Sequence, residues 1–167
     1  KNPNSFFAGT YMMEYAKATM FDNLGDSIEE CNTLINLANT CTNQGLGFFN
    51  LAEDTFILAE KVCQKNNMSY ELSLSVVLRS KLYNSIGMKW YGIPLTILAL
   101  SWARNYSKSA PNHVDNLFHI AYTEIILAES FLNWESANPS TEEKHMNSVR
   151  ALYWTSQAIT TIQVHSL

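Results

Sequence analysis

The chain has 167 residues, of which 47% are apolar and only 16% are charged, and its net charge is -4. Globular domains carry about 25% charged residues, so this composition predicts a folded chain with a weakly charged surface and excludes extensive disorder. Only three arginines and no basic run are available to neutralise a phosphate backbone, so we expect no nucleic-acid partner.

No segment predicts a membrane contact. The longest apolar stretch, Tyr91 to Ala103, is too short to span a bilayer and includes Thr96 and Ser101, which favours a buried helix. No signal peptide is recognisable, and we expect a soluble, cytoplasmic protein. Because the chain begins with Lys1 rather than Met, we expect it to be trimmed, processed or part of a larger helical-repeat protein.

The periodicity of apolar residues predicts an all-α fold. Apolar positions recur at three- and four-residue steps almost everywhere, and no segment shows sustained strand alternation. Asp26 with Glu29 and Ser140 with Glu143 are spaced as capping boxes. Pro94 suits a first helical turn. Seven helices are predicted, near 5–22, 26–43, 47–65, 69–86, 92–107, 112–135 and 140–164.

The helices repeat in pairs when the sequence is compared with itself at a shift of 43 residues. The first helix of each pair keeps an apolar triplet, at Cys31, Leu34 and Ile35, at Leu74, Val77 and Leu78, and at Leu117, Ile120 and Ala121. The candidate N-caps Asp26, Ser69 and Asn112 keep the same spacing. We therefore expect one domain, 1–167, with repeats over 26–68, 69–111 and 112–164, the last with an insertion around 135–144.

The second helices of the pairs also match each other. Their shared positions are Ala52, Phe56, Ala59 and Cys63, then Leu95, Ala99, Trp102 and Tyr106, and, in the opposite direction, Gly9, Met13, Ala16 and Met20. The helix over 5–22 is therefore predicted to be a second helix without a first. It should expose an apolar flank, formed by Phe6, Met13, Tyr15 and Met20, that contacts upstream residues or a second copy of the domain.

The pattern Ala52, Phe56, Ala59, preceded by Leu37 and Ala38, resembles the tetratricopeptide repeat, and the resemblance is best over Asp26 to Gln64. It implies a right-handed superhelix of antiparallel helix pairs that binds proteins or peptides and has no catalytic activity. Any amphipathic bundle also matches itself at some shift, so a closed up-down helical bundle is the alternative fold.

A row of carboxamides marks the helix over 26–43. Asn32, Asn36, Asn39 and Asn43 fall within about 60° of one another around the helix axis. Each carboxamide offers a donor and an acceptor, the complement of a peptide backbone, so we expect this row to bind a peptide. The repeat places Arg79 and Tyr122 at the positions equivalent to Asn36. The alternative interpretation is that an asparagine-rich chain simply exposes asparagine.

Other chemistry finds little support in the sequence. Glu142-Glu143-Lys144-His145 contains a single Glu-x-x-His motif, and a di-iron bundle needs two, so no metal is expected. Cys31, Cys41 and Cys63 lie on apolar faces and are expected to be buried free thiols. We expect no cofactor and no catalytic residue. One alternative function is a bundle that encloses a small apolar ligand among its aromatic residues, Phe48, Phe56, Trp90, Tyr91 and Trp102; a helical enzyme domain is a weaker one.

Overall fold

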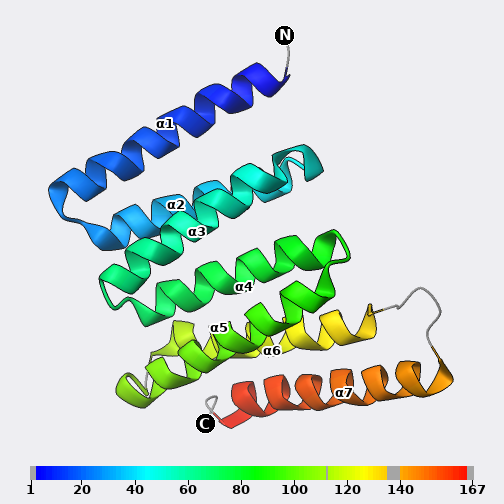
Figure 1. Cartoon of the computed structure of the whole chain (residues 1–167). Coiled ribbons are helices and arrows are strands. Elements are labelled where there is room, and N and C mark those ends of the chain that lie inside the picture. Colours follow the sequence, from blue (N-terminus) through cyan, green and yellow to red (C-terminus); the bar gives the residue numbers. More distant parts are fainter. Residues whose placement is uncertain (1–2, 112, 135–139, 165–167) are drawn as a thin grey trace. The chain divides into compact units, whose positions relative to one another are not determined.

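The computed structural model describes residues 3–111, 113–134 and 140–164, with the side chains of 7–111, 113–134 and 140–163 (Figure 1). Every regular element in these ranges is helical, as predicted. The elements are α1 (Pro3–Leu24), α2 (Ser27–Asn43), the short 3₁₀ helix η1 (Leu46–Phe48), α3 (Phe49–Lys65), α4 (Ser69–Ser85), α5 (Lys89–Ser109), α6 (Val114–Leu132) and α7 (Thr141–Val164). Each predicted helix agrees with an observed one to within three residues at either end. Within these ranges, no helix combines the length and the apolar composition that a bilayer span requires.

The helices form two compact units, residues 1–75 and 76–167. The boundary falls inside α4, and each unit is described by itself. In the N-terminal unit α2 packs against both α1 and α3, and in the C-terminal unit α6 packs against both α5 and α7. Neighbouring helices in sequence are thus neighbours in space, which is compatible with the helix pairs expected from the repeat.

Local sequence sets the helix ends. The Asp26 carboxylate accepts a hydrogen bond from the Glu29 N–H at 3.2 Å, and the Ser140 hydroxyl accepts one from the Glu143 N–H at 3.0 Å, so both residues are N-caps as predicted. The Asp26 N–H bonds to the Phe21 carbonyl rather than to Glu29, so the reciprocal half of that predicted capping box is absent. The predicted cap Ser69 is instead the first residue of α4. The predicted cap Asn112 lies outside the described residues. His113 caps α6 instead, because its ring nitrogen accepts the Asn116 N–H at 3.2 Å.

One predicted detail of the helices is wrong. Pro94 lies inside α5 rather than in its first turn, because the helix already begins at Lys89.

α1 and α4 both end in a left-handed turn, with φ of 73° at Gly25 and 80° at Gly87. At each end a hydrogen bond from the residue after the glycine closes the last helical turn, which lets the chain reverse sharply.

The core of the N-terminal unit is built from small residues facing large ones. One face of α3 is completely buried and consists of Ala52, Phe56, Ala59 and Cys63. On α2, Cys31 is completely buried and Leu34 is 1% exposed. Small side chains on both helices let the backbones approach closely, and the Phe56 ring fills the remaining space. The small-large-small pattern Ala52, Phe56, Ala59 therefore forms the buried face of α3.

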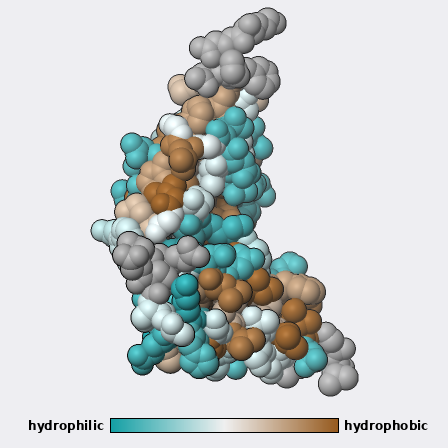
Figure 2. All heavy atoms as spheres, turned by 90° about the vertical axis from the view of Figure 1, so that its right-hand side faces the viewer, coloured by the Kyte–Doolittle hydropathy of each residue, from teal (hydrophilic) through white to brown (hydrophobic). Residues whose placement is uncertain are grey.

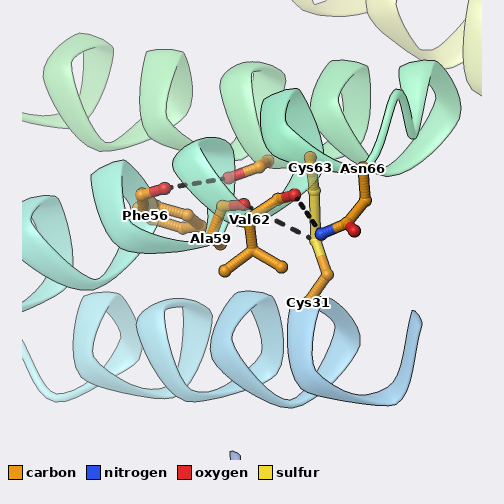
Figure 3. The surroundings of a disulfide bond; sticks show 7 residues. Cys31, Phe56, Ala59, Val62, Cys63 and Asn66 are labelled. Atoms are coloured by element: carbon orange, nitrogen blue, oxygen red, sulfur yellow. Dashed lines mark hydrogen bonds between the residues drawn. A yellow bond between two sulfur atoms is a disulfide. The ribbon is translucent and has the colours of Figure 1, made fainter. Parts of the chain in front are cut away.

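Cys31 and Cys63 form a disulfide that links α2 to α3, with their Cα atoms 6.5 Å apart (Figure 3). The prediction of free thiols is wrong for this pair, because the turn between α2 and α3 brings together two residues 32 positions apart. Cys41 is free and buried, as predicted. Disulfides are rare in cytoplasmic proteins, so this bond gives no support to the expected cytoplasmic location.

The core of the C-terminal unit joins α5, α6 and α7. Its buried apolar residues are Ile93, Leu100, Ala103, Ile120, Leu127, Phe131 and Ala151. Beside them the Glu124 carboxylate of α6, only 1% exposed, accepts a hydrogen bond from Arg104 of α5 at 2.7 Å and one from Thr161 of α7 at 3.0 Å. One buried carboxylate thus connects all three helices of this unit.

Candidate binding surfaces

The predicted carboxamide row lies on the solvent face of α2. Asn36 and Asn43 are exposed, and Asn32 and Asn39 are half-buried. None of the four carboxamides has a hydrogen-bond partner among the described residues. A narrow strip of unpaired amide donors and acceptors therefore runs along α2, and it can bind groups that offer both a donor and an acceptor.

The other two predicted site residues belong to the C-terminal unit. Arg79 is half-buried on α4. The Tyr122 hydroxyl, on α6, accepts a hydrogen bond from Lys81 Nζ at 2.8 Å, and the same ammonium lies 5.5 Å from the centre of the Tyr122 ring. Tyr122 is therefore held by a cation that the sequence analysis did not single out. Because Asn36 belongs to the other unit, its grouping with Arg79 and Tyr122 on one surface stays a prediction.

The solvent face of α6 carries a second row that the sequence analysis missed. Its positions, reached from the asparagines of α2 by two repeat shifts, are Phe118, Tyr122, Ile125 and Glu129, with Leu132 one step further. Phe118 is 61% exposed, Ile125 40% and Leu132 63%. Applying the repeat to all four asparagines, instead of to Asn36 alone, would have found this row. Figure 2 shows that exposed apolar residues, in brown, occur on both units.

The apolar flank predicted for α1 is confirmed where side chains are described. Met13 is 64% exposed, Met20 50% and Tyr15 39%. The side chain of Phe6 lies outside the described residues. Met13 and Met20 are equivalent in the repeat to Phe56 and Cys63, which are completely buried. The helix face that is buried in α3 is therefore exposed in α1.

The described pockets give no support to the apolar-ligand alternative. One lies between α1 and α3, with a volume of about 370 Å³, and is lined by Tyr11, Met12, Tyr15, Leu51, Asp54, Thr55 and Leu58. Two others, each of about 260 Å³, lie in the C-terminal unit and have mixed polar and apolar linings, which include Lys81 in one and Arg104 in the other. None is lined by the five predicted aromatic residues. Phe56 is completely buried, whereas Trp90 is 61% and Tyr91 53% exposed.

Two buried side chains in the described ranges, His119 and Cys41, have shifted pKa values. Burial lowers the pKa of His119 to about 4, so its ring is neutral at pH 7, and burial raises the pKa of the Cys41 thiol to about 11. In the described part of the chain no three His, Cys, Asp or Glu side chains come close enough to hold a metal ion. The Glu142 and His145 side chains are both exposed.

The chain matches no protein-family model, and neither curated proteins nor solved structures show significant similarity to it.

Proposed function

We propose that this chain is a non-catalytic, tetratricopeptide-like interaction module that binds a protein or peptide partner along the solvent faces of its first helices. The observation that carries the proposal is the row of four carboxamides on α2. Exposed helix faces usually carry paired Glu and Lys, and this one carries neither between Asn32 and Asn43.

An extended peptide is the partner that fits this row best. Its backbone alternates N–H and C=O groups, and a carboxamide can accept from one and donate to the other. In the C-terminal unit, Arg79 offers a planar fork for a carboxylate and Tyr122 an amphipathic ring, both favourable at protein interfaces. The partner is thus recognised first through its backbone, with side-chain selectivity added by α4 and α6.

The test is a selection of binders from a displayed library of random peptides, with the whole chain as bait. Peptides enriched by the wild-type chain are then measured against the double variant Asn36→Ala, Asn39→Ala. Losing two hydrogen bonds of about 1 kcal/mol each weakens binding by about 30-fold. Asn50→Ala, on the exposed start of α3, is the matched control and should leave affinity unchanged. A chain that enriches no peptide, or binders indifferent to the double variant, would contradict the proposal.

The exposed flank of α1 is a second contact surface in this proposal. Met13 and Met20 occupy the positions that α3 buries against α2, so a helix presenting an α2-like face is the complementary partner. Replacing both residues with Gln should reduce capture of such a partner without lowering the thermal stability of the chain, because neither side chain is buried.

A further inference from the structure

The apolar row on α6 has the spacing of a helix-helix contact. Phe118, Tyr122, Ile125, Glu129 and Leu132 follow steps of four, three, four and three residues. Such a row stays on one side of a helix over its whole length, and it is the pattern that a second helix buries. Exposed apolar residues aligned in this way favour an interface over isolated surface positions.

The row also reads similarly in both directions from Ile125. Phe118 and Leu132 lie seven residues to either side of it and are exposed to nearly the same degree, 61% and 63%. If two copies of α6 lie antiparallel with Ile125 on the two-fold axis, Phe118 of one copy meets Leu132 of the other. Ile125 then meets itself. A surface with this symmetry is complementary to its own copy.

Charge supports the same pairing. In the antiparallel arrangement Glu129 of one copy comes opposite Tyr122 of the other, where the Lys81 ammonium is held 2.8 Å from the Tyr122 hydroxyl. Glu129 is exposed and forms no ion pair with any described residue. Two symmetric contacts between Glu129 and Lys81 would flank the apolar centre. A parallel pairing would place Glu129 beside Glu129 instead.

We propose that this chain forms a symmetric dimer through antiparallel contact between the solvent faces of two α6 helices. The proposal concerns a partner of defined chemistry, a second copy of the chain. The dimer would cover Tyr122 and the solvent face of α6, but it does not use the carboxamide row of α2, on which the peptide-binding test depends. The peptide-binding test and the dimer test can therefore succeed or fail separately.

Cysteine cross-linking distinguishes the geometry. Ile125→Cys should form a disulfide-linked dimer under mild oxidation, because the two residues meet on the axis. Phe118→Cys alone should not, since the two copies of that residue are about 21 Å apart at a rise of 1.5 Å per residue. A mixture of Phe118→Cys and Leu132→Cys chains should link again. Self-linking of Phe118→Cys as readily as Ile125→Cys would overturn the antiparallel arrangement.

Sedimentation equilibrium, from low micromolar to near-millimolar concentration, tests the dimer without cross-linking. Ile125→Glu places two carboxylates on the axis and should raise the dissociation constant by at least about tenfold. Leu152→Glu, an equally drastic change at an exposed position of α7, should not change it. Glu129→Lys should weaken the dimer, and adding Lys81→Glu should restore it. A wild-type chain that stays monomeric throughout, or an Ile125→Glu chain that dimerises as well as wild type, would refute the proposal.

Discussion

Breaking the Cys31–Cys63 disulfide should destabilise the chain mainly through its unfolded state. Both residues are completely buried, and reduction leaves two thiols in the same space, so the folded core loses little packing. The cross-link closes a loop of 32 residues. Loop-closure entropy for that length corresponds to about 3.7 kcal/mol of unfolding free energy at 25 °C. For a chain of this size the melting temperature should fall by about 7 to 15 °C.

The assay is urea unfolding followed by circular dichroism, with and without a phosphine reductant equilibrated through the unfolded state. The control is Cys63→Ala, whose stability should not depend on the reductant. Alkylation of the denatured, unreduced chain should label Cys41 alone among the three cysteines. Labelling of all three, or equal stability of the wild-type chain in both conditions, would show that Cys31 and Cys63 are thiols and that the reasoning is wrong.

Three further predictions concern single side chains. Gly92→Ala should destabilise the chain by about 1 to 3 kcal/mol, since the added Cβ would clash with the Asn84 carboxamide and approach the Ser80 carbonyl. Asn84→Ala should relieve part of that loss in denaturant unfolding. His119 binds its proton more weakly when folded (pKa about 4) than when unfolded (about 6.5), so stability should fall as pH drops through this window, by about 2 kcal/mol at pH 5. His119→Gln should flatten that dependence in parallel unfolding curves. Cys41 should resist alkylation at pH 8 in the native chain, because burial raises its pKa to about 11, and rapid labelling would contradict its burial.

The helices could be predicted because their signals are local. Capping residues such as Asp26 and Ser140 act within a few positions of the chain. The repeat added information about packing, since it correctly assigned Ala52, Phe56 and Ala59 to a buried face. It failed in α5, where Leu95 and Trp102 align with the completely buried Ala52 and Ala59 but are only half-buried.

The missing parts of the prediction depend on contacts between distant residues. The disulfide needs α2 and α3 to pack side by side, and spacing alone does not show that. Lys81 at Tyr122 and Arg104 at Glu124 pair across 41 and 20 positions, and neither pair follows a helical spacing. The solvent face of α2 could be predicted, because four asparagines at helical spacing are visible in the sequence. The equivalent face of α6 was not recognised, because its apolar residues resemble an ordinary core.

The buried Glu124 carboxylate has a consequence for how the C-terminal unit comes apart. Its two oxygens are shared between Arg104 of α5 and Thr161 of α7. If α7 detached, Glu124 Oε2 would lose its hydrogen bond from Thr161. The buried face of α7 around Ala151 and Ala158 would be exposed to solvent at the same time. Partial opening is therefore costly, and α5, α6 and α7 should exchange their amide hydrogens as one cooperative block. A chain shortened before α7 should lose this block entirely rather than retain a folded remainder of it.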